Sequence, residues 1–211
     1  MSRFIYLHGF ASSPASTKAR FFRGRFEQLG IALEVPDLAE LNFTGLTLTS
    51  QLKVIDRLAC GEPLTLIGSS MGGYLAAIYA ARHAEVEKLV LLAPAFSFRK
   101  RWTEMLGPAT IERWKESGRM DVFHYALGRN EPLGYQLMED ADQYEDYSDC
   151  RQPALILQGR NDTVVPPEYA EEFARRHPQT LLRLLDTDHE MLNALDDMWI
   201  ETEAFLFPAN R

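Results

Sequence analysis

The sequence is poor in cysteine and has no long apolar run. Its 211 residues hold two cysteines, Cys60 and Cys150, with no CxxC spacing between them. That count excludes a disulfide scaffold and favours reduced thiols. Apolar stretches fall well short of the roughly 20 residues that cross a bilayer, and the N-terminus has no signal-peptide pattern. We therefore expect a cytoplasmic protein with no membrane contact.

Positive charge is also scarce. Lysine and arginine number 22 against 30 aspartates and glutamates, which gives a net charge of −8 at pH 7. Such a chain lacks the basic surface that binds nucleic acid non-specifically, so we expect no nucleic-acid partner. The charge is uneven: residues 1–30 carry five basic residues and one acidic residue, whereas residues 131–149 carry seven acidic residues and no basic one.

The length fits one domain over residues 1–211, with no internal repeat and no low-complexity segment. Short apolar runs alternate with longer amphipathic segments along the chain. A run that is apolar on both faces is typical of a strand buried in a parallel sheet. The predicted strands are residues 4–7, 64–67, 89–92 and 155–157, with 31–35 and 181–185 as weaker members.

Between these runs, apolar residues recur at helical spacing. In residues 17–29, for example, one face collects Ala19, Phe22, Phe26 and Leu29. The other predicted helices are residues 48–58, 71–83, 167–177 and 191–205. Strands and helices in alternation predict an α/β fold, a doubly wound and mostly parallel sheet with helices on both faces.

One long segment interrupts the alternation. Residues 97–150 separate two predicted strands and are far longer than one crossover helix requires. They are rich in aromatic and methionine side chains with glycine and proline breaks, and long insertions in compact domains are often functional. We predict a helical, lid-like insertion at about 97–150. The alternative is a plain pair of connecting helices with a core-facing aromatic stripe.

The strongest motif is G-x-S-x-G at residues 68–72, with Ser70 at its centre. A predicted strand precedes it and a predicted helix follows, which is the context of a nucleophile elbow. Side chains in place of Gly68 and Gly72 would collide with the neighbouring strand and helix. The motif alone is weak because glycine and serine are common, but in this context it predicts Ser70 as a nucleophile.

A serine hydroxyl needs a general base at neutral pH, and the chain has five histidines. His189 follows the last predicted strand and a short turn, at the carboxyl edge of the sheet where ligands bind in such folds. We predict His189 as the base. We interpret His83, His124 and His177 as solvated or structural groups, and His8 lies at a strand end.

The base in turn needs an acid that fixes its tautomer and stabilises the imidazolium. Asp162 comes shortly after the predicted strand 155–157, so its carboxylate is expected at the same edge of the sheet. Asp188 adjoins His189, but neighbours on a loop rarely face each other. We therefore predict Asp162 as the acid, with the chain order Ser70, Asp162, His189.

Acyl transfer also needs N–H donors for the oxyanion of the tetrahedral intermediate. One is predicted from the backbone of Met71, which follows the nucleophile at the start of a helix. The second is predicted from the loop after the first strand, residues 8–14, with the Phe10 N–H preferred and Ala11 next. A simple strand-to-helix turn is the alternative interpretation of this loop.

Together these motifs resemble α/β-hydrolases and, more closely, the small bacterial YqiA-like esterases. The resemblance rests on Y-L-H-G-F-x-S-S-P at residues 6–14, on G-S-S-M-G-G-Y at residues 68–74, and on the loops of Asp162 and His189. It covers the whole chain and implies an α/β-hydrolase fold that hydrolyses carboxylic esters or thioesters without a cofactor. Residues 97–150 look longer than the link in those minimal proteins, which leaves the substrate open.

The predicted function is a serine hydrolase that cleaves carboxylic esters through an acyl-enzyme. The alternatives are an acyl-CoA or other thioesterase, a small peptidase, and a non-catalytic binding protein on a hydrolase scaffold. No metal site is implied, because no second histidine is spaced to join the acidic residues beside His189. We expect a small-molecule ester or thioester as substrate, and a monomer or homodimer.

Substrate contacts are the least predictable part. Large apolar side chains near the motifs are candidates for an acyl site, although core packing is the alternative for most: Phe10, Tyr74, Phe96, Phe98 and Trp102. Arg20 and Arg23 lie opposite the apolar face of the helix at 17–29 and are candidates for contacts to the phosphates of an acyl-CoA. A solvated helix face is the plainer interpretation of these two arginines.

Overall fold

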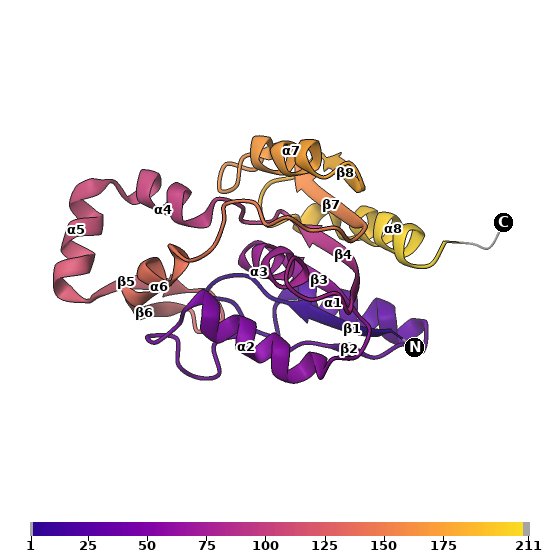
Figure 1. The fold of residues 1–211 in the computed structure, drawn as a ribbon, viewed down its shortest axis with the longest axis horizontal. Helices are drawn as coiled ribbons and strands as arrows, with labels where there is room; N and C mark the ends of the chain where they lie inside the picture. The colour runs from indigo at the N-terminus through magenta and orange to yellow at the C-terminus, as the bar shows by residue number, and fades with distance from the viewer. Residues whose placement is uncertain (1, 209–211) are drawn as a thin grey trace.

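A computed structural model describes residues 2–208 of the chain and contains a six-stranded sheet. The strand order is β2-β1-β3-β4-β7-β8, and every neighbouring pair is parallel, which confirms the predicted doubly wound sheet (Figure 1). The strands are β1 (Arg3–Leu7), β2 (Leu33–Glu34), β3 (Leu64–Ser69), β4 (Val86–Leu92), β7 (Ala154–Gly159) and β8 (Thr180–Leu185). The edge strand β2 is shorter than the predicted 31–35.

Helices cover both faces of this sheet. One face packs against α1 (Thr17–Gln28) and α8 (Leu195–Leu206), which follows the 3₁₀ turn η1 (Leu192–Ala194). The other face packs against α2 (Leu48–Ala59), α3 (Met71–Ala80) and α7 (Pro167–Arg176). Within residues 2–208, no helix is both long and apolar enough to cross a membrane.

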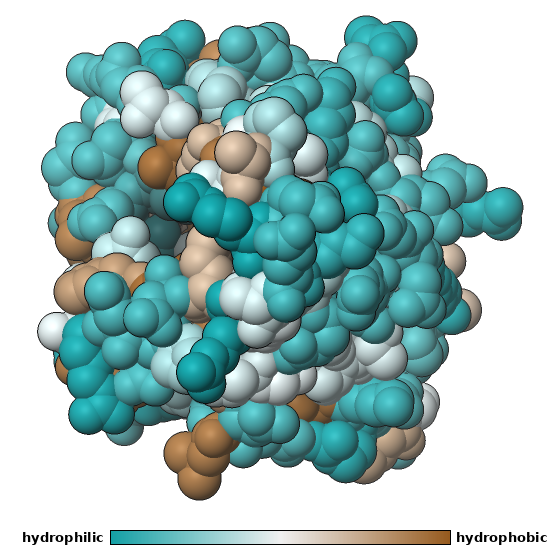
Figure 2. All heavy atoms as spheres, turned by 90° about the vertical axis from the view of Figure 1, so that its left-hand side faces the viewer, coloured by the Kyte–Doolittle hydropathy of each residue, from teal (hydrophilic) through white to brown (hydrophobic). Residues whose placement is uncertain are grey.

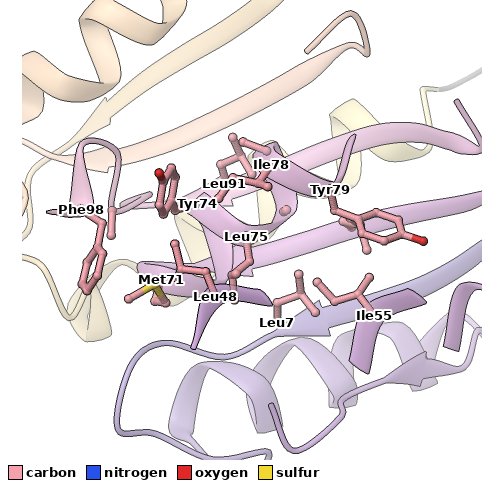
Figure 3. Packing of buried hydrophobic residues seen from close by; sticks show 14 of the residues in the cluster. Leu7, Leu48, Ile55, Met71, Tyr74, Leu75, Ile78, Tyr79, Leu91 and Phe98 are labelled. Atoms are coloured by element: carbon pink, nitrogen blue, oxygen red, sulfur yellow. The ribbon is translucent and has the colours of Figure 1, made fainter. Parts of the chain in front are cut away.

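Alternate residues of the strands point to opposite faces of the sheet and so belong to two separate hydrophobic cores. Along β1, Ile5 and Leu7 join the core on the α2–α3 side, whereas Tyr6 joins the core on the α1–α8 side. Figure 3 shows the first core, where Leu7 and the α2 residues Leu48 and Ile55 pack around α3. Each fully buried aliphatic side chain contributes roughly 1.5–3 kcal/mol, so the central strands are held firmly from both sides.

Residues 97–150, called the insertion from here on, contain both helices and strands. The elements are α4 (Phe98–Leu106), α5 (Pro108–Ser117), β5 (Arg119–His124), β6 (Arg129–Gly134) and α6 (Gln136–Ala141). The expectation of a helical insertion was therefore wrong for its centre, where β5 and β6 form an antiparallel hairpin. Gly118 and Gly128 adopt positive φ on either side of β5, which ends the helix before it and closes the turn after it.

The insertion lies beyond the carboxyl ends of the strands, on the left in Figure 1. Within the insertion, Trp114 Nε1 donates to the Leu133 carbonyl at 2.9 Å. Contacts to the rest of the chain include the Gly134 N–H, which donates to the Thr44 carbonyl at 3.0 Å, and the Phe10 and Trp102 rings, whose centroids are 5.0 Å apart. Figure 2 looks onto this end of the molecule, where hydrophobic residues are scattered among hydrophilic ones.

The strand order places a switch point between β1 and β3. From β1 the chain moves outward to β2, and from β3 it moves the other way to β4. Loops that leave a sheet in opposite directions open a crevice between them, where ligands bind in doubly wound folds. The loop after β1 and the turn after β3 meet there, and the turn carries Ser70.

Candidate active site

Ser70 lies in a strained turn between β3 and α3. Its backbone has φ 53° and ψ −116°, which an L-residue with a side chain rarely adopts. The turn is fixed by its neighbours: the Ser70 N–H donates to the Leu92 carbonyl at 2.8 Å, and the Ser70 carbonyl accepts from the N–H groups of Gly73 at 2.9 Å and Ala95 at 3.0 Å. These bonds hold the strain in place and present the side chain at the end of the strand.

The two glycines of the motif have no room for a side chain. A Cβ on Gly68 would lie 2.3 Å from the Gly72 carbonyl oxygen, and a Cβ on Gly72 would lie 2.1 Å from the Leu7 carbonyl oxygen. Both neighbours are backbone atoms, which cannot move without shifting the strand or the helix. The steric role predicted for these glycines is confirmed.

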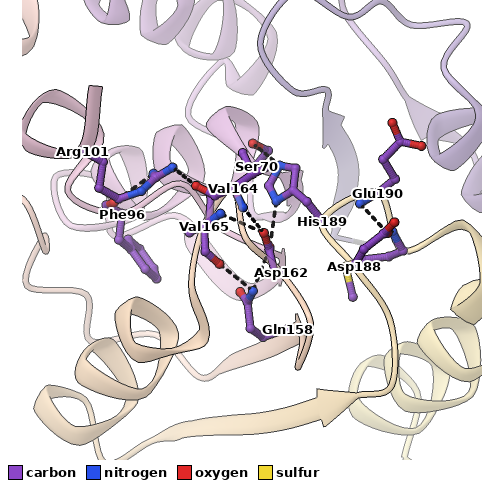
Figure 4. A network of polar contacts seen from close by, with 11 residues as sticks. Ser70, Phe96, Arg101, Gln158, Asp162, Val164, Val165, Asp188, His189 and Glu190 are labelled. Carbon is purple, nitrogen blue, oxygen red and sulfur yellow. Dashed lines mark hydrogen bonds and ion pairs between the residues drawn. The ribbon is translucent and has the colours of Figure 1, made fainter. Parts of the chain in front are cut away.

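His189 joins Ser70 to Asp162 (Figure 4). Its Nε2 lies 3.1 Å from Ser70 Oγ, and its Nδ1 lies 2.8 Å from Asp162 Oδ2. Because an ionised carboxylate only accepts hydrogen bonds, Nδ1 carries the proton and Nε2 is left to accept from the serine hydroxyl. The structure thus brings together the three side chains that the sequence predicts as nucleophile, base and acid.

The Asp162 carboxylate is fully buried and makes four hydrogen bonds. Oδ1 accepts from the backbone N–H groups of Val164 at 2.9 Å and Val165 at 2.8 Å, and Oδ2 accepts from Gln158 Nε2 at 2.9 Å and from His189. Burial opposes ionisation, but His189 and the other donors outweigh it and hold the pKa of Asp162 below its usual value. The acid is therefore anionic at neutral pH.

The loop that carries His189 is shaped by Asp188. The Asp188 Oδ1 accepts the N–H groups of Glu190 at 3.0 Å and Met191 at 3.1 Å, so its carboxylate caps its own turn instead of facing His189. Gly159 lets this loop pass close to β7, since a Cβ there would lie 2.5 Å from the Asp188 carbonyl oxygen. Asp188 is thus a loop-forming residue, and the weaker candidate for the acid lies away from the imidazole.

Two further residues of the site were not predicted from the sequence. Gln158 is fully buried at the end of β7, where its Nε2 donates to Asp162 Oδ2 and, at 3.0 Å, to the Val165 carbonyl. Arg101 reaches from α4 to the Val164 carbonyl at 2.6 Å. Gln158 could have been noticed in the sequence, because it is a polar residue at the end of an otherwise apolar strand. Nothing in the sequence near Arg101 indicates a contact with the acid loop.

The loop after β1 lies against Ser70. A Cβ on Gly9 would lie 3.5 Å from the Cβ of Ser70, so the neighbouring Phe10 is close to the nucleophile. The Phe10 N–H donates to no acceptor within residues 2–208, and the Met71 N–H belongs to the first turn of α3, where helical N–H groups have no intrahelical partner. The Met71 N–H directly follows the nucleophile and the Phe10 N–H lies one residue beyond Gly9, so their role as oxyanion donors stays a prediction.

His8 shapes this loop and does not act as a base. It is buried, its Nε2 accepts the Leu38 N–H at 3.2 Å, and its Nδ1 donates to the Gly9 carbonyl at 2.9 Å. Burial lowers the pKa of His8, which keeps the ring neutral in this tautomer. His83, outside the triad, stacks on Tyr79 with ring centroids 3.8 Å apart.

The predicted acyl-site residues divide into two groups. Phe10 and Trp102 are half-buried and meet edge to face between the β1 loop and α4. The other three are buried in the core: Tyr74, Phe96 and Phe98. Tyr74 donates its hydroxyl proton to the Glu145 carbonyl at 2.8 Å, and Phe96 stacks on Phe173 with ring centroids 4.4 Å apart. Only the first group keeps surface with which to contact a ligand.

The charged groups near the site include no metal cluster. Within residues 2–208, no three or more histidine, cysteine, aspartate or glutamate side chains are arranged to hold a metal ion. Arg20 and Arg23 are exposed on α1, so their role toward a phosphate group stays a prediction.

Comparison with solved structures defines the class of fold. Alpha/beta hydrolase domain-containing protein 10 from mouse has a TM-score of 0.81 at 20% sequence identity, over 96% of this chain and 88% of that chain. Est1E from Butyrivibrio proteoclasticus, in a structure with ferulic acid bound, has a TM-score of 0.75 at 19% identity, over 97% of this chain and 90% of that chain. At these identities the similarity concerns the fold alone. The chain therefore has the α/β-hydrolase fold.

Comparison of sequences gives the family. Residues 3–205 match the uncharacterised protein family UPF0227, and the chain belongs to that family. The AB hydrolase superfamily protein YisY of Bacillus subtilis (strain 168) is 28% identical over 157 residues. That match spans 57% of this chain and 57% of the Bacillus protein. The resemblance to YqiA-like members of the α/β-hydrolase superfamily, stated from the motifs, is confirmed.

Proposed function

We propose that this protein is a serine hydrolase that cleaves carboxylic esters through an acyl-enzyme on Ser70. The observation that carries the proposal is the hydrogen-bonded line from Ser70 Oγ through His189 to Asp162, with distances of 3.1 and 2.8 Å. A nucleophile bonded to a base, and the base bonded to an orienting acid, is the arrangement that activates a serine. It lies at the switch point of the sheet, where such folds bind ligands.

In the first half of the reaction, Ser70 attacks the ester carbonyl. His189 Nε2 takes the hydroxyl proton as the Oγ–carbon bond forms, and the carbonyl electrons move onto the oxygen. The backbone N–H groups of Phe10 and Met71 donate to that oxyanion. Collapse of the intermediate breaks the carbon–oxygen bond to the alcohol, and His189 returns the proton to the leaving alkoxide.

In the second half, water repeats these steps on the acyl-enzyme. His189 takes a proton from water as water attacks the acyl carbon, and Ser70 leaves with that proton restored. Asp162 stays anionic throughout and stabilises the imidazolium in both halves. Its low pKa fits this role, because a carboxylate that is held ionised by four hydrogen bonds does not take the proton itself.

Phe10 and Trp102 are the proposed contacts to the acyl group. Their half-buried rings meet between α4 and the β1 loop, whose Gly9 lies against Ser70. Aromatic surface of this kind favours an apolar acyl chain. A cytoplasmic location and a monomeric or homodimeric state remain predictions from the sequence.

The test is turnover of a substrate panel by the wild-type protein and by Ser70→Ala. The panel holds 4-nitrophenyl esters and CoA thioesters of matched acyl length, from two carbons upward. We expect ester hydrolysis by the wild type and a loss of up to about 10⁶ in kcat in Ser70→Ala, with unchanged thermal unfolding. Faster turnover of the thioesters would point to a thioesterase. Near wild-type turnover by Ser70→Ala would refute the assignment of the nucleophile.

A further inference from the structure

Arg101 is the one residue of the insertion that contacts the acid loop in Figure 4. It lies in the first turns of α4 and is half-buried. Its Nη2 donates to the Val164 carbonyl at 2.6 Å, and its Nη1 donates to the Phe96 carbonyl at 3.3 Å. The guanidinium therefore joins two segments, the loop that carries Asp162 and the segment that follows β4.

The bond to Val164 continues to the acid through a single peptide group. The carbonyl of Val164 and the N–H of Val165 belong to the same planar unit, and that N–H donates to Asp162 Oδ1 at 2.8 Å. A cation on the carbonyl side polarises the peptide and makes its N–H a stronger donor. Arg101 thus strengthens and orients a hydrogen bond to the acid without touching it.

The bond to Phe96 leads toward the nucleophile. Phe96 follows Ala95, whose N–H donates to the Ser70 carbonyl at 3.0 Å. Arg101 therefore bridges a segment bonded to the backbone of Ser70 and a segment bonded to the carboxylate of Asp162. A shift of α4 would move both ends of this bridge together.

The charge of Arg101 has no paired carboxylate. Within residues 2–208, the ion pairs of the structure do not include this side chain, and the ring of Tyr169 lies 5.5 Å from its guanidinium carbon. Burial lowers the pKa of Arg101, while the nearby charges of Tyr169 and Asp162 raise it in part. By contrast, Arg99 on the same helix pairs with Asp142, as expected of a surface residue.

We propose that Arg101 is a positioning residue for the acid, through which helix α4 of the insertion sets the orientation of the Asp162–His189 pair. This inference rests on the proposed function, since it assigns a role toward the same reaction. It gives the insertion a second task besides contact with the acyl group. Arg101 acts through the peptide between Val164 and Val165 and makes no contact with the reacting atoms.

The proposal predicts a change in rate and in pH dependence but little change in substrate binding. Arg101→Met keeps an unbranched apolar stem, shorter than that of arginine, and removes the charge and both hydrogen bonds. We expect kcat for 4-nitrophenyl acetate to fall roughly tenfold to a hundredfold, with KM within about threefold. A weaker hydrogen bond to Oδ1 of Asp162 leaves more negative charge on Oδ2, next to His189, and this favours the imidazolium. The acid limb of the kcat/KM profile is therefore expected to move to higher pH.

The experiment measures kcat, KM and the rate of fluorophosphonate labelling of Ser70 between pH 5 and 9. It compares the wild type with Arg101→Met, with Arg101→Lys, and with Arg99→Met as the matched control on the same helix. We expect Arg101→Lys, which keeps the charge and one donor group, to lie between the wild type and Arg101→Met, and Arg99→Met to behave as the wild type. Added guanidinium at millimolar concentration is expected to restore part of the labelling rate of an Arg101→Ala variant.

Three results would overturn the proposal. If Arg101→Met labels Ser70 at the wild-type rate and shows the same acid limb in its pH profile, Arg101 does not position the acid. If Arg99→Met changes the labelling rate and the pH profile as much as Arg101→Met does, the effect belongs to the helix in general and not to Arg101. If Arg101→Met does not fold, a folded Arg101→Lys with wild-type rate and pH profile overturns the proposal in its place. Failure of the proposed function is separate and visible in the wild type: absence of labelling at Ser70 refutes both proposals.

Discussion

At the carboxyl edge of the sheet, backbone hydrogen bonds at the strand ends hold Ser70 and Asp162, whereas packing between aromatic side chains supplies much of the contact within the insertion. Ser70 is fixed by four backbone hydrogen bonds, and the Asp162 carboxylate accepts from two backbone N–H groups. In the insertion, aromatic rings of α4 and α5 pack on one another, for example Trp102 and Trp114 with centroids 6.0 Å apart. The nucleophile and the acid are therefore positioned mainly by the backbone, whereas much of the packing in the insertion depends on the identity of its side chains.

Among the residues that support Ser70 and His189 at the carboxyl edge of the sheet, we expect substitution of the acid Asp162 to lower kcat most. Asp162→Asn keeps the shape of the side chain but gives it an N–H₂ group that favours the wrong tautomer of His189. We expect kcat to fall about 10⁴-fold, by analogy with the same change in a serine protease, while KM stays within a few-fold. Steady-state kinetics with an activated ester measure this. A loss under tenfold would mean that Asp162 does not orient the base.

Substitution of a glycine in the turn around Ser70 tests how tightly the backbone packs at the carboxyl edge of the sheet. A Cβ at position 72 would lie 2.1 Å from the Leu7 carbonyl oxygen, so Gly72→Ala must move β1 or α3. We expect a loss of about 3 kcal/mol or more in the free energy of unfolding, with slower labelling of Ser70. Gly24→Ala is the control, because nothing lies within 4 Å of its Cβ. Equal stability of the two variants would contradict the tight packing of the turn.

The insertion is tested at its buried tryptophan. Trp114→Phe keeps an aromatic ring but removes the buried hydrogen bond to the Leu133 carbonyl and the extra volume of the indole. We expect a loss of about 2 kcal/mol in the free energy of unfolding, measured by urea denaturation, and an altered preference for acyl length. The labelling rate of Ser70 should stay within about threefold. A tenfold slower rate would show that this part of the insertion is coupled to the edge.

The smallest effect is expected at Lys18 on α1. Burial lowers the pKa of Lys18 to about 8, although Glu190, Asp162 and Asp188 raise it in part. Between about pH 8 and 10.5 the folded protein loses this proton before the unfolded chain does, so stability rises with pH in that window. Lys18→Met should remove about 1 kcal/mol of that rise.

Denaturation at pH 7.5 and at pH 10.5 measures the effect of Lys18, with the exposed Lys53→Met as control. The wild type should gain stability relative to Lys18→Met as the pH rises. A constant difference between the two proteins across this range would show that Lys18 carries its usual pKa.

The parts of the fold that the sequence predicts correctly are those set by local pattern. Fully apolar runs marked the central strands because both faces of the sheet are covered. The spacing of Gly68, Ser70 and Gly72 marked the turn because backbone atoms approach each glycine closely. The side chains of Ser70, Asp162 and His189 could be predicted together because each follows a strand of the same parallel sheet.

The parts that were missed depend on contacts between distant segments. The strands β5 and β6 of the hairpin have only six residues each. An alternation of apolar and polar residues that is this short is hard to recognise as a strand among the surrounding aromatic residues. Gln158 and Arg101 reach the acid loop through side chains, and no local spacing encodes such contacts. Three of the predicted acyl-site residues, Tyr74, Phe96 and Phe98, proved to be buried in the core.

The most direct test of the central claim is to map where a fluorophosphonate probe reacts. The wild-type protein and Ser70→Ala are incubated with the probe, and intact mass and peptide mapping locate the adduct. A serine activated by His189 and Asp162 predicts one adduct per chain, on Ser70, and none in Ser70→Ala. An adduct on another residue, or equal labelling of the two proteins, would contradict the assignment of Ser70 as the nucleophile.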